Sequence, residues 1–241
     1  TRSLCDWSSD VCSSDLTQYI ELNKKTIQLT SDIAACSGTK EDVRMLIDAV
    51  RTPALNYVVA QSFLLEKQMD DIEKVTLPRL KTMSGYNRNM AYVVSEAPTD
   101  LSGAGFVPLK VHAYSGYIMH FMKHWRTPKE EIGRVLRIAY AWTVDAIGVF
   151  FPILELPAKA LPHIRGKVIP ALRDALSRAS ASIRLDELYV RPMLRDSDRA
   201  IMEIALALDF TDVQICRINA VREYKGVFYL SEIVEPNGKT V

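Results

Sequence analysis

The longest apolar run in the chain, residues 138–156, places the tightest limit on what the chain can fold into. It reads IAYAWTVDAIGVFFPILEL. A helix that spans a membrane needs about 20 nearly uncharged residues, but Asp145, Pro152 and Glu155 interrupt this run. We therefore expect a buried core helix that ends near Pro152, in a soluble protein with no membrane contact.

The remaining sequence predicts a mostly α-helical α+β protein. With 24% charged and 48% hydrophobic residues, the composition is that of a globular chain, which excludes disordered and disulfide-framework classes. Residues 30–83 have a helical pattern, and Thr39 with Asp42 is typical of a capping box. A small β segment is expected near 90–114, where two β-leaning runs flank the turn-rich PTDLSGAG. Helices are expected again from residue 116.

The first 16 residues, TRSLCDWSSDVCSSDL, differ from the rest. They resemble a translated sequencing adapter in a shotgun-assembled metagenomic reading frame, so we expect a non-native, disordered segment and a missing natural N-terminus. The expected domains are then a mainly helical one, 17–185, and a smaller one, 186–241. Two cysteines outside the first segment, Cys36 and Cys216, have no CxxC spacing, which favours a reducing, cytoplasmic location.

The net charge of +1 conceals an uneven distribution. Residues 17–109 have 10 basic and 11 acidic side chains, residues 110–185 have 12 and 5, and residues 186–241 have 7 and 10. A basic middle segment is compatible with a nucleic acid or another polyanion as partner. Lysines and arginines that only solvate exposed helix faces would explain it too, and no interleaved aromatic residues mark a base-stacking surface, so the sequence leaves both interpretations open.

Residues 201–221, IMEIALALDFTDVQICRINAV, suggest two short helices that cross at a steep angle. Ala205 is small where the two backbones would approach, and Thr211 can cap the second helix. Apolar residues stand at the offsets that would fill the angle: Ile204, Leu208, Phe210, Ile215 and Ile218. This pattern resembles the helix-turn-helix of transcription regulators, except that Asp209 occupies the turn position where glycine is usual.

The residues that follow extend the resemblance to a winged helix. Lys225-Gly226 is typical of a helix stop, VFYLSEIV of a strand, EPNG of a turn and KTV of a returning strand. We therefore expect a winged-helix-like module over about 197–241, made of two helices and a β-hairpin. The chain stops within the expected wing, so the module is expected to be truncated.

The resemblance implies a nucleic-acid-binding protein, either a transcription regulator or a replication or mobile-element accessory factor. The second helix would enter a DNA major groove, and the implied nucleic-acid-binding residues are Thr211, Gln214, Arg217, Arg222 and Lys225. Arg217 would contact guanine, Gln214 adenine and Arg222 a phosphate. The acidic excess of residues 186–241 is an objection, because affinity for DNA comes largely from phosphate neutralisation.

Two other classes of function stay open. A protein-interaction or scaffold module is favoured by the acidic C-terminal segment and by apolar Val213 and Val221. A metal-dependent enzyme is the weaker alternative: His120 and His124 have the i, i+4 spacing of helix-borne ligands, but no HExxH motif accompanies them. The sequence contains no P-loop, no GxGxxG and no catalytic constellation, so no cofactor, metal or catalytic residue is predicted.

Overall fold

The chain folds into two compact units. A computed structural model describes residues 13–186, 191–193, 195–196 and 198–234, with side chains from Thr17 onward except at position 159. Unit 1 is Thr1–Tyr117 and unit 2 is Ile118–Val241. The division falls within a helix, whereas the sequence suggested one between 185 and 186. The chain does not divide at 185/186 because residues before and after that position, such as Ile183 and Met202, belong to one apolar core.

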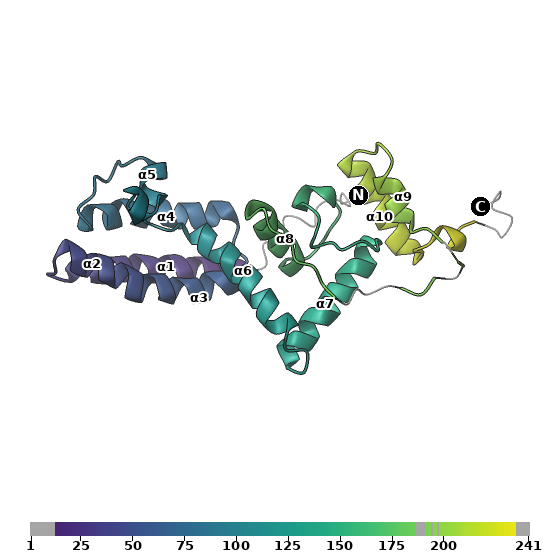
Figure 1. The fold of residues 1–241 in the computed structure, drawn as a ribbon, viewed down its shortest axis with the longest axis horizontal. Helices are drawn as coiled ribbons and strands as arrows, with labels where there is room; N and C mark the ends of the chain where they lie inside the picture. Colours follow the sequence, from purple (N-terminus) through teal and green to yellow (C-terminus); the bar gives the residue numbers. More distant parts are fainter. Residues whose placement is uncertain (1–12, 187–190, 194, 197, 235–241) are drawn as a thin grey trace. The chain divides into compact units, whose positions relative to one another are not determined.

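Unit 1 is helical. Its elements are α1 (Ser13–Ala35), α2 (Lys40–Leu46), η2 (Ile47–Arg51), α3 (Thr52–Ser62), α4 (Glu66–Met83), α5 (Tyr92–Glu96), η3 (Thr99–Leu101) and the start of α6 (Leu109–Trp125). Helices α3 and α4 both pack against α1 (Figure 1). Leu55, Val59 and Ile72 have no exposed surface, and they fill the space that the helices enclose.

The capping box predicted at the start of α2 is confirmed. The Thr39 hydroxyl accepts a hydrogen bond from the Asp42 amide, and the Asp42 carboxylate accepts one from the Thr39 amide at 2.8 Å. These bonds satisfy backbone donors that a helix start leaves without partners.

The β segment predicted near 90–114 is wrong. Helix α5, the short η3 and the start of α6 occupy it. Its backbone groups find partners other than a neighbouring strand: the Arg44 guanidinium donates to the carbonyls of Ala104 and Gly105 at 2.6 and 2.8 Å. The Phe106 amide donates to the Ser95 carbonyl at 2.9 Å. With these groups satisfied, no strand pairing is needed.

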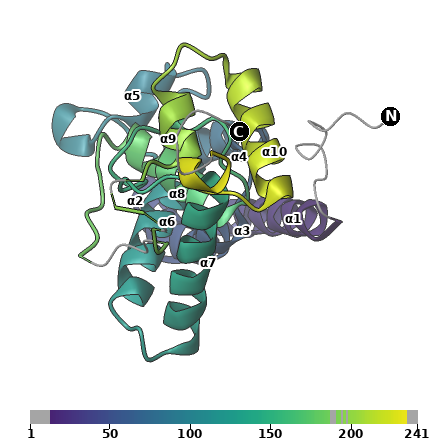
Figure 2. The same cartoon turned by 90° about the vertical axis from the view of Figure 1, so that its right-hand side faces the viewer.

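Unit 2 contains the second half of α6 and a further group of helices. These are α7 (Glu131–Ile147), η4 (Ala158–Ala160), α8 (Val168–Arg178), α9 (Ile201–Leu206), α10 (Asp212–Lys225) and η5 (Leu230–Glu232). One apolar core joins residues from α6, α7, α8, α9 and α10. Figure 2 shows α9 and α10 side by side, and the two helices are in contact.

The long apolar run forms a core helix, but that helix ends earlier than predicted. Helix α7 stops at Ile147, where Gly148 has the left-handed conformation with φ 75°. Val149, Ile153 and Leu154 then enter the core as non-helical chain. Among the residues that the structure describes, no helix is both long and apolar enough to cross a membrane.

The α+β fold class and the β-hairpin wing are wrong, because the described chain is helical and contains no sheet. Within the predicted first wing strand, the described residues 227–234 include η5 and a single antiparallel bridge between Ala200 and Tyr229. The Glu232 carboxylate accepts hydrogen bonds from the amides of Phe228 and Tyr229, so these donors are satisfied without a second strand. The predicted turn and return strand, 235–241, lie outside the described residues.

Candidate functional site

The residues predicted to bind nucleic acid all lie on α10 or at its N-cap, and two of them hold the start of the helix. The Thr211 hydroxyl accepts from the Gln214 amide, and the Gln214 side chain accepts from the Thr211 amide at 2.8 Å. This is a capping box like that of α2. The Gln214 side chain that the resemblance assigned to adenine is therefore already hydrogen-bonded within the protein.

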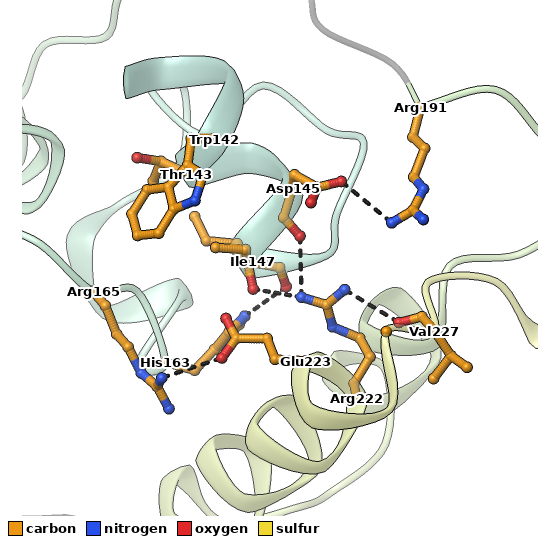
Figure 3. Close-up of a pocket in the computed structure, with 12 residues that line it drawn as sticks. Trp142, Thr143, Asp145, Ile147, His163, Arg165, Arg191, Arg222, Glu223 and Val227 are labelled. Carbon is orange, nitrogen blue, oxygen red and sulfur yellow. Dashed lines mark hydrogen bonds and ion pairs between the residues drawn. The ribbon is translucent and has the colours of Figure 1, made fainter. Parts of the chain in front are cut away.

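The three basic residues predicted on α10 have different environments. Arg217 and Lys225 are exposed, whereas Arg222 is only 5% exposed. The Arg222 guanidinium donates to the carbonyls of Asp145 and Ala146, the first at 3.0 Å (Figure 3). It also donates to Asn219 Oδ1 at 2.9 Å. Arg222 therefore supports the fold from within and does not present its charge to a phosphate.

The Arg222 contacts complete the C-terminus of α7, where the last four carbonyls have no partner within the helix. The Val144 carbonyl accepts from the Gly148 amide, those of Asp145 and Ala146 from Arg222, and that of Ile147 from His163 Nε2 at 3.0 Å. A cation at this end also balances the negative pole of the helix dipole. The sequence gives no sign of this cap, because its donors come from two distant segments.

His163 is a buried, neutral part of the cap. Burial lowers the pKa of the imidazole, and the positive charges of Arg222, Arg173 and Arg165 lower it further, while the hydrogen bond to Ile147 opposes the shift. Because a carbonyl accepts and never donates, Nε2 carries the proton in this bond. Protonation of the second nitrogen would place a charge in a desolvated site.

A cavity of about 290 Å³ opens at this end of α7, which we name the arginine pocket (Figure 3). Its lining residues are Trp142, Thr143, Asp145, Ala146, Ile147, His163, Arg165, Arg191, Arg222, Glu223, Gly226 and Val227. Arg165 contacts Glu223 at 3.1 Å, and Arg191 contacts Asp145 at 3.5 Å. Three guanidinium groups thus share the pocket with two carboxylates.

The face of α7 that points away from the core carries four large apolar side chains besides Glu131, which is unusual for a surface helix. Ile132, Val135, Ile138 and Trp142 are between 59% and 69% exposed. Their spacing of three, three and four residues places them on one side of the helix, and we name them the α7 surface. The opposite side packs Tyr140, Val144 and Ile147 into the core. A helix that is apolar on both sides is normally covered on both.

The helix pair α9 and α10 departs from the expected packing. Ala205 and Ile215 are buried as predicted, but Leu208 is 53% exposed and Phe210 is 41% exposed. Both follow the end of α9, which has only six residues, so neither can fill the angle between the helices. Val213 and Val221, the residues that favoured a protein-interaction module, are exposed too.

The described surface of residues 118–185 is basic. Exposed side chains are basic at Lys123, Arg126, Lys129, Arg134, Arg165, Lys167, Arg178 and Arg184, and acidic at Glu130, Glu131 and Glu155. The positive charge inferred from the sequence therefore lies largely on the surface. At the start of α7 the exposed charges are mixed, with Lys129 and Arg134 near Glu130 and Glu131 in the sequence.

The histidine pair does not form a metal site in the described part of the chain. The rings of His120 and His124 lie 5.3 Å apart on α6, but no group of three or more ligating side chains is found among the described residues. The Cys36 thiol donates to the Asp32 carbonyl at 3.4 Å, and the Cys216 thiol donates to the Pro162 carbonyl at 3.7 Å.

Comparison of the chain with protein-family models, with curated proteins and with solved structures finds no match, so its function is inferred from its own residues and geometry.

Proposed function

We propose that unit 2 is a protein-interaction module that binds an acidic amphipathic helix of a partner protein along the α7 surface. The observation that carries the proposal is the row of four large apolar side chains, each more than half exposed, on a helix whose other side already forms core. The row runs from Ile132 to Trp142, which is about 15 Å along the helix axis. This length matches a partner helix that contributes apolar residues from two to three turns.

The charge of this segment favours an acidic partner. Exposed basic side chains outnumber acidic ones by eight to three over the described part of residues 118–185. A helix with acidic residues beside its apolar row would place opposite charges next to Lys129 and Arg134, if those residues lie away from Glu130 and Glu131. Such complementarity speeds association and selects among partners.

The same basic surface would attract nucleic acid, but the arrangement of α10 favours protein. The Arg222 guanidinium is engaged in capping α7, and the side-chain oxygen of Gln214 is engaged in capping α10. Exposed Asp209 and Asp212 precede Arg217 at the end of α10 that would have to enter the groove. Nucleic-acid binding therefore stays a prediction from the sequence, and the experiment below includes it as an outcome.

The test uses the full chain and a fluorescein-labelled synthetic peptide of 18 residues with leucine at i, i+3, i+4 and i+7 positions and glutamate beside them. We expect saturable binding by fluorescence anisotropy and a blue shift of Trp142 emission. Ile138→Glu should weaken binding at least tenfold, because it puts a charge into the apolar contact. Val221→Glu is the matched control, since it makes the same change at a comparably exposed valine on α10, and it should bind as the wild type does.

Two results would overturn the proposal. In the first, Ile138→Glu binds the peptide as well as Val221→Glu does. In the second, the peptide fails to bind and duplex DNA binds at low salt with an affinity that Arg217→Ala and Lys225→Ala reduce, which would assign nucleic-acid binding to α10 instead.

A further inference from the structure

We infer that the arginine pocket accepts a carboxylate from an acidic side chain of the helix docked on α7. This inference rests on the proposed function and adds the residue of the partner that is recognised. It starts from a continuity: Trp142 is the last member of the α7 surface and also lines the arginine pocket (Figure 3). A helix that lies along α7 toward Ile147 therefore reaches the mouth of the pocket.

The charges in the pocket leave room for one anion. Arg165, Arg191 and Arg222 contribute three positive charges, and Asp145 and Glu223 contribute two negative ones. Arg222 spends its hydrogen bonds on neutral groups, mainly backbone carbonyls, and its charge is felt by Glu223, Asp145 and, from outside the lining, Glu232. Burial lowers the pKa of His163, which keeps the imidazole neutral. One carboxylate would bring the charges of the lining residues close to neutrality.

Arg165 and Arg191 are placed to bind that carboxylate. Their side chains are 56% and 35% exposed, and each has one ion pair across the pocket, at 3.1 and 3.5 Å. A guanidinium has five N–H donors in a planar fork, so an ion pair with one oxygen leaves others for an incoming group. Arginine binds carboxylates in two-point contacts that fix their direction. The cavity of about 290 Å³ is large enough for a glutamate side chain.

The test is a double-mutant cycle on the full chain. One peptide is the acidic helix of the preceding section with an amidated C-terminus and a glutamate one turn beyond its apolar row. The second peptide has glutamine at that position. We expect Arg165→Gln and Arg191→Gln each to weaken binding of the glutamate peptide about tenfold, and to leave binding of the glutamine peptide nearly unchanged.

The matched control is Arg134→Gln, which removes an exposed positive charge from α7 itself, outside the pocket. It should weaken both peptides by the same small factor, because a general charge effect does not depend on that one glutamate. If Arg165→Gln and Arg191→Gln weaken the binding of both peptides equally, or of neither, the pocket does not bind the glutamate carboxylate and the inference is wrong. The proposed function survives that outcome as long as Ile138→Glu still weakens binding at least tenfold.

A peptide with a free C-terminus and no glutamate beyond the row separates the two sources of a carboxylate. If this peptide alone shows coupling to Arg165 and Arg191, the pocket reads a chain terminus and the side-chain assignment is overturned. Loss of all peptide binding in the wild type overturns the proposed function and this inference together.

Discussion

Replacing Arg222 with alanine separates a structural role from a role in nucleic-acid binding. Arg222→Ala removes the donors to the carbonyls of Asp145 and Ala146 and the bond to Asn219. A buried acceptor that loses its only donor costs about 1–3 kcal/mol. The two carbonyls are partly buried, so we take the lower part of that energy range for each of them. We then add the packing that is lost with the aliphatic part of the Arg222 side chain. The unfolding free energy of unit 2 should fall by about 3 kcal/mol.

Urea unfolding followed by tryptophan fluorescence measures this loss. Trp125 and Trp142 both belong to unit 2, and a Trp7→Phe background leaves them as the reporters. With a urea dependence of about 2 kcal/mol per molar, the midpoint should fall by roughly 1.5 M. Arg217→Ala is the control on the same helix, and because Arg217 is exposed it should change stability by less than about 0.5 kcal/mol.

The opposite result is equally clear. If Arg222 served as a phosphate contact, its side chain would face solvent, and Arg222→Ala would be as mild as Arg217→Ala. A midpoint shift below about 0.3 M, which corresponds to about 0.5 kcal/mol, would refute the cap described for α7.

Two further predictions concern the same unit. Burial lowers the pKa of His163 below its ordinary value of 6.5 in the folded protein. The stabilisation that neutral His163 provides is therefore present above pH 6.5 and is lost as the pH falls toward the lower folded pKa. Unfolding free energies measured by urea from pH 8 to 5 should drop more steeply in the wild type than in His163→Gln, by up to about 1.4 kcal/mol per pH unit, and parallel profiles would contradict this. Gly133→Ala should destabilise unit 2 by about 2 kcal/mol or more, because the new Cβ would lie 2.2 Å from the Thr127 carbonyl oxygen. This loss should outweigh the roughly 1 kcal/mol by which alanine normally favours a helix over glycine. Thermal unfolding measures the change, and a raised Tm would show that the turn between α6 and α7 shifts to accommodate the methyl group.

Local features were predictable from the sequence. The caps at Thr39 and Thr211 form between residues three apart, so their chemistry is contained in a short stretch of sequence. The helix pair near 201–225 was found for the same reason, since its periodicity and its cap are local signals. The exposed apolar row of α7 was not predicted, because the run 138–156 was expected to form a buried core helix, whereas Ile138 and Trp142 are exposed.

Features that depend on distant partners were not predictable. Glu73 lies in the charged segment EKQMDDIEK, which reads as a solvated helix face, yet it is buried and accepts the Leu109 amide at 2.7 Å. The prediction of a β-hairpin wing was wrong for a similar reason. Residues 227–234 have strand-like composition, but Glu232 accepts hydrogen bonds from two backbone amides that a second strand would have used.

What the sequence alone determined is the helical character of the chain, the positions of its capped helix starts, and the basic middle segment. All three follow from residue type and near-neighbour spacing. Only the tertiary structure decided that Arg222 points inward to α7 while Arg217 on the same helix faces solvent. The physical reason is that the unsatisfied carbonyls at the end of α7 lie 76 and 77 residues away in the chain, and a buried acceptor takes the nearest donor in space, whatever its distance in sequence.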